Sequence, residues 1–401
     1  METVKVLKDY RKLDHIKEIM RVNIIFFLFF MLSDSMDVFM PLFFKSHNQS
    51  ATLYGGLQTV ATVFRLIVIW LLAKPQMKTK KRILLGVFSL NIINFMMINV
   101  SAQYLTFYVF IMFIVTRTVL NMVMNPYLGR LLPNEYMGIG FGVRDVFLSA
   151  GCAAGLFVCG FLQKNLVYFT IYIITVFSIL LALIVSMRFT NVEDIEDEDE
   201  EDEHLKGWSS VAPKMKVNFI IMLVIGCLVA CGLEVHTYSA MIGNDFGVKA
   251  QNIYNLYASS VLITCVFSII GGVIIDKFNS KLMYFLYTLI CFMSVGVLCF
   301  KSPYAYAVSL IMLGIKGVLD NVEQTYLFKA YKAYDMEKLY SIESIIETVL
   351  SIVTPILFGY LYDFNFNIML LSGLGCLLIA TVCSMGIVDI NKQEKESKDN
   401  A

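Results

Sequence analysis

Residues 117–128 (RTVLNMVMNPYL) place polar side chains at helical spacing inside a long apolar run. Arg117, Asn121 and Asn125 follow one another every four positions, so they share one face of a helix. A cation and two amides on one face form a polar stripe inside hydrocarbon, where polar groups are costly and usually functional. This chemistry indicates a path for polar molecules.

The same pattern returns 199 positions later, in residues 316–327 (KGVLDNVEQTYL). Five of the twelve positions carry the same residue in both segments. In the second segment Lys316, Asp320 and Glu323 recur at helical spacing, and Gln324 lies beside them. Polar stripes at matching depth in two apolar halves are typical of a substrate path between two helix bundles. Chance similarity between two apolar helices is the alternative explanation.

Among the other ionisable residues inside apolar runs, five are candidates for the same cavity: Asp34, Asp37, Arg65, Glu234 and His236. Asp34 and Asp37 are three positions apart, so they lie on one helix face. A charge at the bilayer centre costs at least about 2.5–3.5 kcal/mol, so these side chains must face one another or water instead of lipid. We expect them to line a polar central cavity. Structural ion pairs between helices, with Asp34–Arg65 first among them, are the alternative.

The acids of this set predict proton coupling. Burial and like-charge neighbours favour the protonated carboxyl, so one or two acids should hold a proton near neutral pH. The proton carriers are expected among Asp34, Asp37, Glu234, Asp320 and Glu323. Arg117 or Lys316 would release the proton by a change of partner, while His236 either relays protons or is a hydrogen-bonded helix residue. Sodium coupling is disfavoured, because no Gly/Pro-broken helix indicates a cation cage.

The composition identifies an integral membrane protein. Apolar residues make up 58% and charged residues 16% of the 401 positions, whereas soluble domains average roughly 45–50% and about 25%. Nine cysteines lie in apolar runs without a CxxC pair or a Cys/His cluster, so we expect neither a metal site nor disulfides. No nucleophile–base or metal-ligand spacing indicates an enzyme, and no cofactor is expected besides a coupled proton.

Twelve apolar runs are long enough to cross a bilayer, which takes about 20 residues. They lie near residues 21–43, 53–73, 82–100, 104–128, 139–162, 166–188, 217–241, 252–275, 281–300, 303–327, 340–362 and 366–388. Six precede and six follow the stretch 193–203, which carries ten acids in eleven residues and cannot enter a bilayer. The predicted fold is therefore an all-α membrane protein of two pseudo-symmetric six-helix bundles.

Small residues recur in two of these runs. Gly151, Gly155 and Gly160 lie in the run 139–162, and Pro355 and Gly359 lie in the run 340–362. Residues without a large side chain let a neighbouring backbone approach, so we expect close helix contacts at these positions.

The predicted segments are an amphipathic cytosolic segment 1–20, a first bundle 21–190, an acidic cytosolic linker 191–216, a second bundle 217–390 and a cytosolic tail 391–401. With the N-terminus in the cytosol, 25 of the 32 Lys and Arg residues fall on the cytosolic side and four on the other side. This bias agrees with the positive-inside rule. We therefore expect a multi-pass protein of the cell membrane with both termini in the cytosol.

The loop at 272–281 (GVIIDKFNSK) resembles the motif G-x-L-a-D-r-x-G-r-r of the major facilitator superfamily. The matching residues are Gly272, Ile274, Asp276, Lys277 and Lys281, and Asn279 replaces the second glycine. The counterpart at 73–82 (AKPQMKTKKR) keeps the basic end but lacks the Gly and the Asp, and Arg117 resembles the arginine of the family's fourth helix. The resemblance implies a secondary transporter that works by alternating access. It does not fix the substrate or the coupling ion.

The pseudo-symmetry of that family predicts a cytosolic gate. The loop with Asp276 and Lys277 would face Arg144, whereas the basic loop with Lys74 and Lys78 would face Glu343. Opposite charges meet on both sides, so these pairs would hold the cytosolic side closed in the outward-open state, at about 0.5–2 kcal/mol each. Ordinary interfacial charges are the alternative.

The leading interpretation is a proton-coupled carrier of a small polar or ionisable solute, because the expected cavity mixes both signs of charge. An efflux antiporter of drugs or amphiphilic cations is one alternative. A non-transporting sensor or scaffold of the same fold is another. The expected partners are the solute and the lipid bilayer, without nucleic acid, and the protein is expected to be a monomer.

Overall fold

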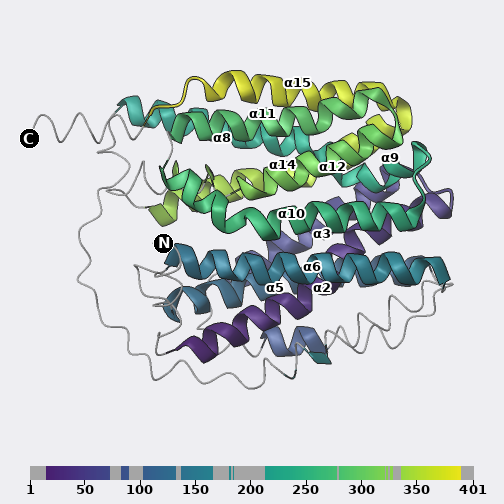
Figure 1. Ribbon diagram of the computed structural model, residues 1–401, viewed down its shortest axis with the longest axis horizontal. Helices are drawn as coiled ribbons and strands as arrows, with labels where there is room; N and C mark the ends of the chain where they lie inside the picture. The colour runs from purple at the N-terminus through teal and green to yellow at the C-terminus, as the bar shows by residue number, and fades with distance from the viewer. Residues whose placement is uncertain are drawn as a thin grey trace, which may run out of the picture. The chain divides into compact units, whose positions relative to one another are not determined.

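Within the residues that it describes, the computed structural model is helical where the apolar runs predict helices (Figure 1). It describes residues 15–72, 83–89, 103–131, 137–165, 180–181, 184, 213–277, 280–320, 322–323, 326–327 and 336–389. The helices are α2 (Ile16–Ser46), α3 (Ala51–Leu72), α5 (Gln103–Leu131), α6 (Met137–Asn165), α8 (Pro213–Leu233), η4 (Glu234–Tyr238), α9 (Ser239–Asp245), α10 (Ala250–Lys277), α11 (Ser280–Gly296), η5 (Val297–Phe300), α12 (Pro303–Val318), α14 (Met336–Phe364) and α15 (Phe366–Ser384). A helix pairs its backbone N–H and C=O groups internally, which the hydrocarbon of a bilayer requires.

Seven helical segments of the described chain are long and apolar enough to cross a membrane. They lie at Ile16–Ser46, Ala51–Leu71, Gly142–Phe161, Pro213–Asp245, Lys281–Phe300, Ile345–Phe364 and Phe366–Ser384. Two shorter apolar helices are Phe110–Asn125 and Pro303–Val318. Each coincides with a predicted run, so the all-helical membrane fold is confirmed. The total of twelve spans stays a prediction, because the runs 82–100 and 166–188 lie mostly outside the described residues.

The chain forms two compact units. The first comprises Met1–Met40, Val60–Glu196 and Ala250–Ile269, and the second comprises Pro41–Thr59, Asp197–Lys249 and Ile270–Ala401. Helices α2, α3 and α10 therefore contribute residues to both units. The boundaries expected at 190 and 217 stay a prediction, and most of the acidic linker lies outside the described residues.

In the first unit α6 packs closely on α2, at two of the small residues that predict such a contact. A Cβ at Gly151 would overlap the carbonyl oxygen of Phe27, and a Cβ at Gly155 would overlap that of Met31. Only glycine lets the two backbones approach this far. The two helices are therefore tightly packed against each other. They carry Asp37 and Arg144, two of the charged residues that the sequence predicts for the site.

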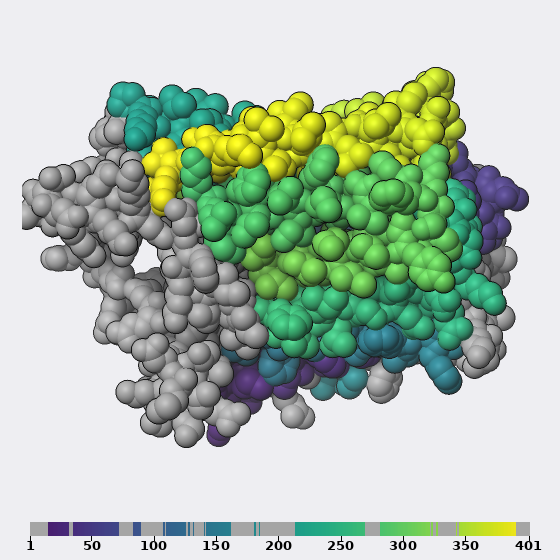
Figure 2. Space-filling view, turned by 45° about the horizontal axis from the view of Figure 1, so that its top comes forward, coloured from purple at the N-terminus to yellow at the C-terminus, as the bar shows by residue number. Residues whose placement is uncertain are grey.

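In the second unit α15 lies against α8 and α11, α11 lies beside α12, and α14 packs on α8 (Figure 1). Glycines again set the closest approach, because a Cβ at Gly232 of α8 would lie 2.9 Å from the carbonyl oxygen of Gly373 of α15. Helices α15 (yellow) and α11 (green) lie at the surface in Figure 2. Contacts with α14 and α15 thus hold α8 in place.

The apolar run at 217–241 forms a helix that tightens before its end. Helix α8 ends at Leu233, Glu234–Tyr238 form the 3-10 helix η4, and α9 continues from Ser239. A 3-10 stretch inside a longer helix is poorer in hydrogen-bond geometry and often marks a functional hinge. The change of winding lies at two predicted site residues, Glu234 and His236.

Candidate functional site

The polar face of α5 meets an acid of α2 in the first unit. The Nη1 atom of Arg117 donates to Oδ2 of Asp37 at 3.1 Å. The guanidinium also lies over the Phe30 ring, 5.0 Å from its centroid, which is a cation–π contact. Phe30 and Asp37 are seven positions apart, so one face of α2 supplies both contacts. The charged side chains are 37% and 45% exposed, so the pair borders open space instead of a packed core.

A second arginine contacts the same two helices. Arg144 of α6 donates from Nη1 to Oδ1 of Asn125 at 2.7 Å and from Nε to Oδ1 of Asp145 at 2.9 Å. Its guanidinium lies 5.6 Å from the centroid of Phe26, and the Phe26 ring stacks on Phe30 at 6.0 Å. The polar stripe of α5 therefore ends at an arginine that the sequence assigns to a gate. The gate role of Arg144 stays a prediction.

The second unit holds the other charged stripe, where α12 ends. The Nζ atom of Lys316 lies 2.7 Å from Oδ1 of Asp320 and 5.9 Å from the ring centroid of Tyr287 on α11. The side chain of Lys316 is 19% exposed, whereas that of Asp320 is 45% exposed. This ion pair reaches from the interior of the unit to an open surface, and its two charges cancel.

Two glutamates face one point of α8 in the same unit. Tyr284 of α11 donates its hydroxyl to Oε1 of Glu323 at 3.0 Å. A Cβ built on Gly226 would lie 2.9 Å from Oε1 of Glu323 and 3.3 Å from Oε1 of Glu347. The two carboxylates thus share the space that the glycine leaves open. The Lys316–Asp320 pair is neutral, so acids outnumber bases among these four described side chains.

Helix η4 carries two buried polar groups with unpaired atoms. Oε2 of Glu234 accepts from Oγ1 of Thr354 at 3.1 Å, and Nε2 of His236 lies 3.0 Å from Oγ of Ser294. Oε1 of Glu234 and Nδ1 of His236 are buried with no hydrogen-bond partner among the described residues. Buried polar atoms of folded proteins almost always have a partner, so each of these two atoms calls for a water or a proton to complete its hydrogen bonding.

Asp363, at the end of α14, caps α3 within the second unit. Its Oδ1 accepts from the Ala51 amide at 3.0 Å, and its Oδ2 accepts from the Thr52 amide at 2.8 Å and from the Thr52 hydroxyl at 2.6 Å. The first four amides of a helix have no acceptor within the helix. The carboxylate therefore performs, from a distant part of the sequence, the task of a local N-cap.

Three further contacts lie at this end of the second unit. Nζ of Lys45 lies 2.6 Å from Oδ1 of Asp245, and the Tyr362 hydroxyl donates to the same carboxylate. Tyr238 of η4 donates its hydroxyl to the carbonyl oxygen of Pro355. We define the end cluster as Lys45, Ala51, Thr52, Asp245, Tyr362 and Asp363. It joins the ends of α2 and α3 to the ends of α9 and α14.

Several predicted site residues lie outside the described part of the chain, namely Lys74, Lys78 and Gln324. The side chains of Asp34, Asp276, Lys277 and Glu343 also lie outside it, although their backbones belong to helices α2, α10 and α14. Arg65 is exposed on α3, and Asn121 is half-buried on α5. Within each unit the structure joins one predicted cation to one predicted acid, which are Arg117 with Asp37 and Lys316 with Asp320. The roles of all these residues stay predictions.

Glu347, Asp245 and Asp363 are not among the site residues that the sequence predicts. Glu347 carries a usable signal, since it lies inside the apolar run 340–362 and follows Glu343 by four positions, on the same helix face. Asp245 and Asp363 lie near helix ends, where acids are common, so their types and positions alone give no signal.

The chemistry available in the described ranges is ion pairing, hydrogen bonding and proton uptake. Among these residues there is no group of three or more His, Cys, Asp or Glu side chains that could hold a metal ion.

Comparison with known protein families gives one match. The model of the Major Facilitator Superfamily matches residues 117–318 and 224–400. These two ranges together cover more than half of the chain. No curated protein sequence matches this chain.

Three solved structures illustrate the likeness in fold. Nucleoside transporter NupG is similar with a TM-score of 0.68 and 12% identity, over 92% of this chain and 98% of that chain. A bacterial homologue of the human lysosomal transporter Spinster has a TM-score of 0.65 and 10% identity, over 92% and 95% of the two chains. The transporter FucP has a TM-score of 0.58 and 14% identity, over 92% and 97%. At these identities the likeness concerns the fold alone.

Proposed function

Because the chain belongs to the major facilitator superfamily, we propose that it is a secondary active transporter of a small polar or ionisable solute that works by alternating access. The observation that carries this proposal is the charge within the apolar runs. Each unit has an ion pair that borders open space, Arg117–Asp37 in the first and Lys316–Asp320 in the second. A charge that faces lipid at the bilayer centre costs at least about 2.5–3.5 kcal/mol, so water and solute are better neighbours for these pairs.

Proton coupling is the second part of the proposal. Glu323 and Glu347 face the same small space beside α8, and like charges at close range in a poorly solvated site favour a shared proton. Lys316 can release that proton if it leaves Asp320 and pairs with a glutamate. The ion pair and the carboxylates would then exchange partners during transport.

The solute is proposed to be polar and able to hydrogen-bond. The polar groups of the described chain combine a guanidinium, an ammonium, amides and hydroxyls with carboxylates, a set that suits a zwitterion or a polyhydroxylated molecule. One of the similar structures is the nucleoside transporter NupG. Nucleosides are therefore the first compounds to test.

An efflux antiporter of amphiphilic cations is the second candidate. The excess of negative charge at Glu323 and Glu347 favours it, and so do the rings of Tyr284 and Tyr287, whose centroids are 6.3 Å apart. Aromatic faces and carboxylates together attract organic cations. Binding of organic cations in preference to neutral polar solutes would select this candidate.

The proposed setting is the cell membrane, with both termini in the cytosol and the protein acting as a monomer. The distribution of Lys and Arg supports this orientation, because the side with both termini carries 25 of the 32 basic residues. A proton is the proposed coupling ion, and no resident cofactor is proposed.

The experiment combines binding and transport on the full purified chain. A thermal-shift screen of nucleosides, other metabolites and organic cations at two pH values identifies solutes, because a ligand of the folded state raises Tm by mass action. Liposomes loaded with such a solute should show counterflow of the labelled solute. An imposed proton gradient should then drive its accumulation.

Substitutions separate transport from proton coupling. Glu323→Gln and Glu347→Gln should keep counterflow and lose gradient-driven accumulation. Glu18→Gln, which removes an acid that pairs with Arg21 at the start of α2, should keep both. Accumulation that persists in both site variants would refute coupling through this pair. Absence of counterflow for every solute that binds would refute transport and favour a sensor or scaffold.

A further inference from the structure

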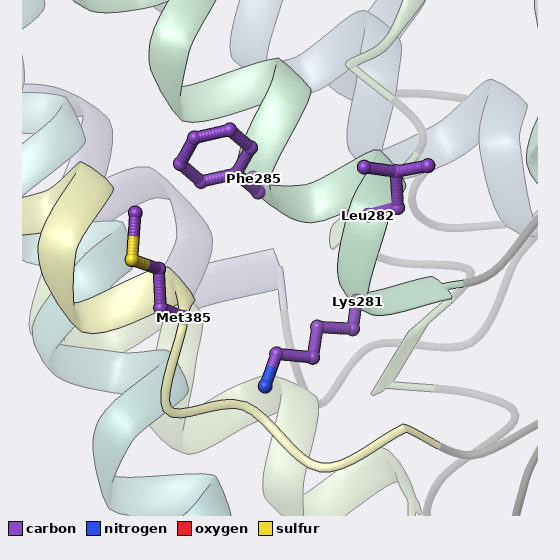
Figure 3. Close-up of a pocket in the computed structure, with 4 residues that line it drawn as sticks. All are labelled: Lys281, Leu282, Phe285 and Met385. Atoms are coloured by element: carbon purple, nitrogen blue, oxygen red, sulfur yellow. The ribbon is translucent and has the colours of Figure 1, made fainter.

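A hollow of about 270 Å³ lies between the start of α11 and the end of α15 in the second unit. Its lining residues are Lys281, Leu282, Phe285 and Met385. The Phe285 ring and the Met385 side chain border the space from two helices, and the Lys281 amine extends toward the chain that leaves α15 (Figure 3). The hollow therefore has apolar walls and a single cation at its edge.

Both helices that border the hollow also carry exposed apolar side chains, which we call the apolar strip. On α15, Leu378 is 52% exposed, Val382 is 59% exposed and Met385 is 54% exposed. Their spacing of four and three positions places them on one helix face. On α11, Leu282 and Met293 are 47% and 46% exposed. A strip of this kind is suited to the acyl chains of a lipid.

Basic groups lie at the same end of the unit as the hollow. Lys281 is the second residue of α11, and no described carboxylate forms an ion pair with it. Lys214 is exposed in the first turn of α8. This end of α8 lies beside the end of α15, because Asn218 of α8 accepts from the amide of Val388, just beyond α15, at 3.0 Å.

We propose that the hollow binds an anionic phospholipid. The lipid belongs to the leaflet on the side of the acidic linker, residues 191–216. The lipid phosphate pairs with Lys281, and an acyl chain fills the hollow against Phe285 and Met385 and continues along the strip. A soluble anion would leave the apolar walls in water, whereas an uncharged chain would leave the ammonium without a counter-ion. Anionic lipids concentrate in the cytosolic leaflet, the side to which the Lys and Arg distribution assigns this end of the helices.

A single tryptophan in the hollow tests the proposal on the full chain. Phe285→Trp, in a background with Trp70→Phe and Trp208→Phe, loses fluorescence when a brominated acyl chain touches the ring. The purified protein is placed in phosphatidylcholine vesicles that contain increasing fractions of a brominated lipid. We expect half-maximal quenching at a fraction about fivefold lower for brominated phosphatidylglycerol than for brominated phosphatidylcholine, the preference that one lysine near a membrane surface gives.

Substitutions of the lysine show whether its charge causes the preference. Lys281→Gln should abolish it, and Lys281→Arg should retain it. Lys249→Gln is the matched control and should leave the preference intact. Lys249 is exposed directly before α10, which begins at Ala250 and ends at Lys277, close in sequence to Lys281. Lys249 and Lys281 are therefore separated by the length of this helix. Size-exclusion chromatography checks that each variant is folded and monodisperse.

Three results would overturn the proposal. One is equal quenching by the two brominated lipids in the parent protein. Another is a preference that survives in Lys281→Gln. The third is release of the brominated lipid by glycerol phosphate, which would show that the hollow takes a soluble anion instead of a lipid.

Discussion

Replacing Asp363 with alanine should release the first two amides of α3 to hydrogen exchange. The carboxylate of Asp363 accepts from the amides of Ala51 and Thr52 at 3.0 and 2.8 Å, and it also accepts from the Thr52 hydroxyl at 2.6 Å. Neither amide has an acceptor within the first turn of the helix. The next two amides of the turn donate to Ser50 and do not depend on Asp363.

The magnitude follows from the number of these bonds and from their exposure. Loss of an N-cap costs about 0.5–2 kcal/mol. A charged acceptor of several bonds favours the upper part of this range, but Asp363 is exposed and water competes for the amides. A cost of about 1–2 kcal/mol corresponds to roughly five- to thirtyfold faster exchange where exchange follows local opening. Asp363→Asn keeps one acceptor oxygen without the charge, so its effect should be intermediate.

Hydrogen exchange measured by mass spectrometry on the full chain in detergent reports this effect on peptides that span residues 51–54. Asp245→Ala is the matched control, because it removes an acid of the same end cluster that contacts α2 and α14 instead of the start of α3. Unchanged exchange in a folded Asp363→Ala variant would refute the cap. An equal increase in Asp245→Ala would show that the whole end cluster opens, and the specific role of Asp363 would be wrong.

Three further predictions concern packing, a surface ion pair and the glutamates. Gly155→Ala should destabilise the protein by about 1–3 kcal/mol, because the added Cβ overlaps the backbone of α2. The control is Gly142→Ala on the same helix, where the added Cβ enters open space and should not lower Tm. Equal melting temperatures of the two variants would contradict the close contact. Lys45→Glu should cost about 0.2–1 kcal/mol, since the pair is partly exposed. Addition of Asp245→Lys should recover part of the lost Tm, because the ion pair returns with its charges exchanged whereas the hydrogen bond from Tyr362 to Asp245 is lost. A double variant that melts no higher than Asp245→Lys alone would argue against the pair. Gly226→Val should displace Glu323 and Glu347, because its side chain enters the space that their carboxylates share. Gradient-driven accumulation of solute in liposomes should then fall more than counterflow. Full accumulation would show that this space has no role in proton coupling.

The helices were predictable because crossing a bilayer requires length and hydrophobicity, and both can be read from the sequence. Helix α14 covers the run 340–362 and α2 covers the run 21–43, each with a few residues added at its ends. The polar stripe of α5 was predictable for a related reason, since the helical period alone decides which residues share a face.

The contacts of the polar residues were less predictable, because they depend on how helices pack. Arg144 contacts Asn125, 19 positions away. The sequence does not single out this partner, because several other amides and acids lie at a similar depth in the predicted membrane helices. Asp363 caps a helix 312 positions away, and no local pattern marks a cap that another helix supplies. The 3-10 helix η4 was missed because neither a proline nor a glycine pair marks it.

Aqueous labelling of single cysteines tests most directly the central claim that the polar faces of these helices border water. The variants are Asn121→Cys on α5 and Asp320→Cys after α12, in liposomes and in a background without the nine native cysteines. Leu371→Cys on α15 is the control, because this side chain is 65% exposed on an apolar helix. We predict that a water-soluble maleimide labels positions 121 and 320, that a transported solute slows this labelling, and that position 371 stays unlabelled. Unreactive cysteines at 121 and 320 in a folded protein would contradict the claim.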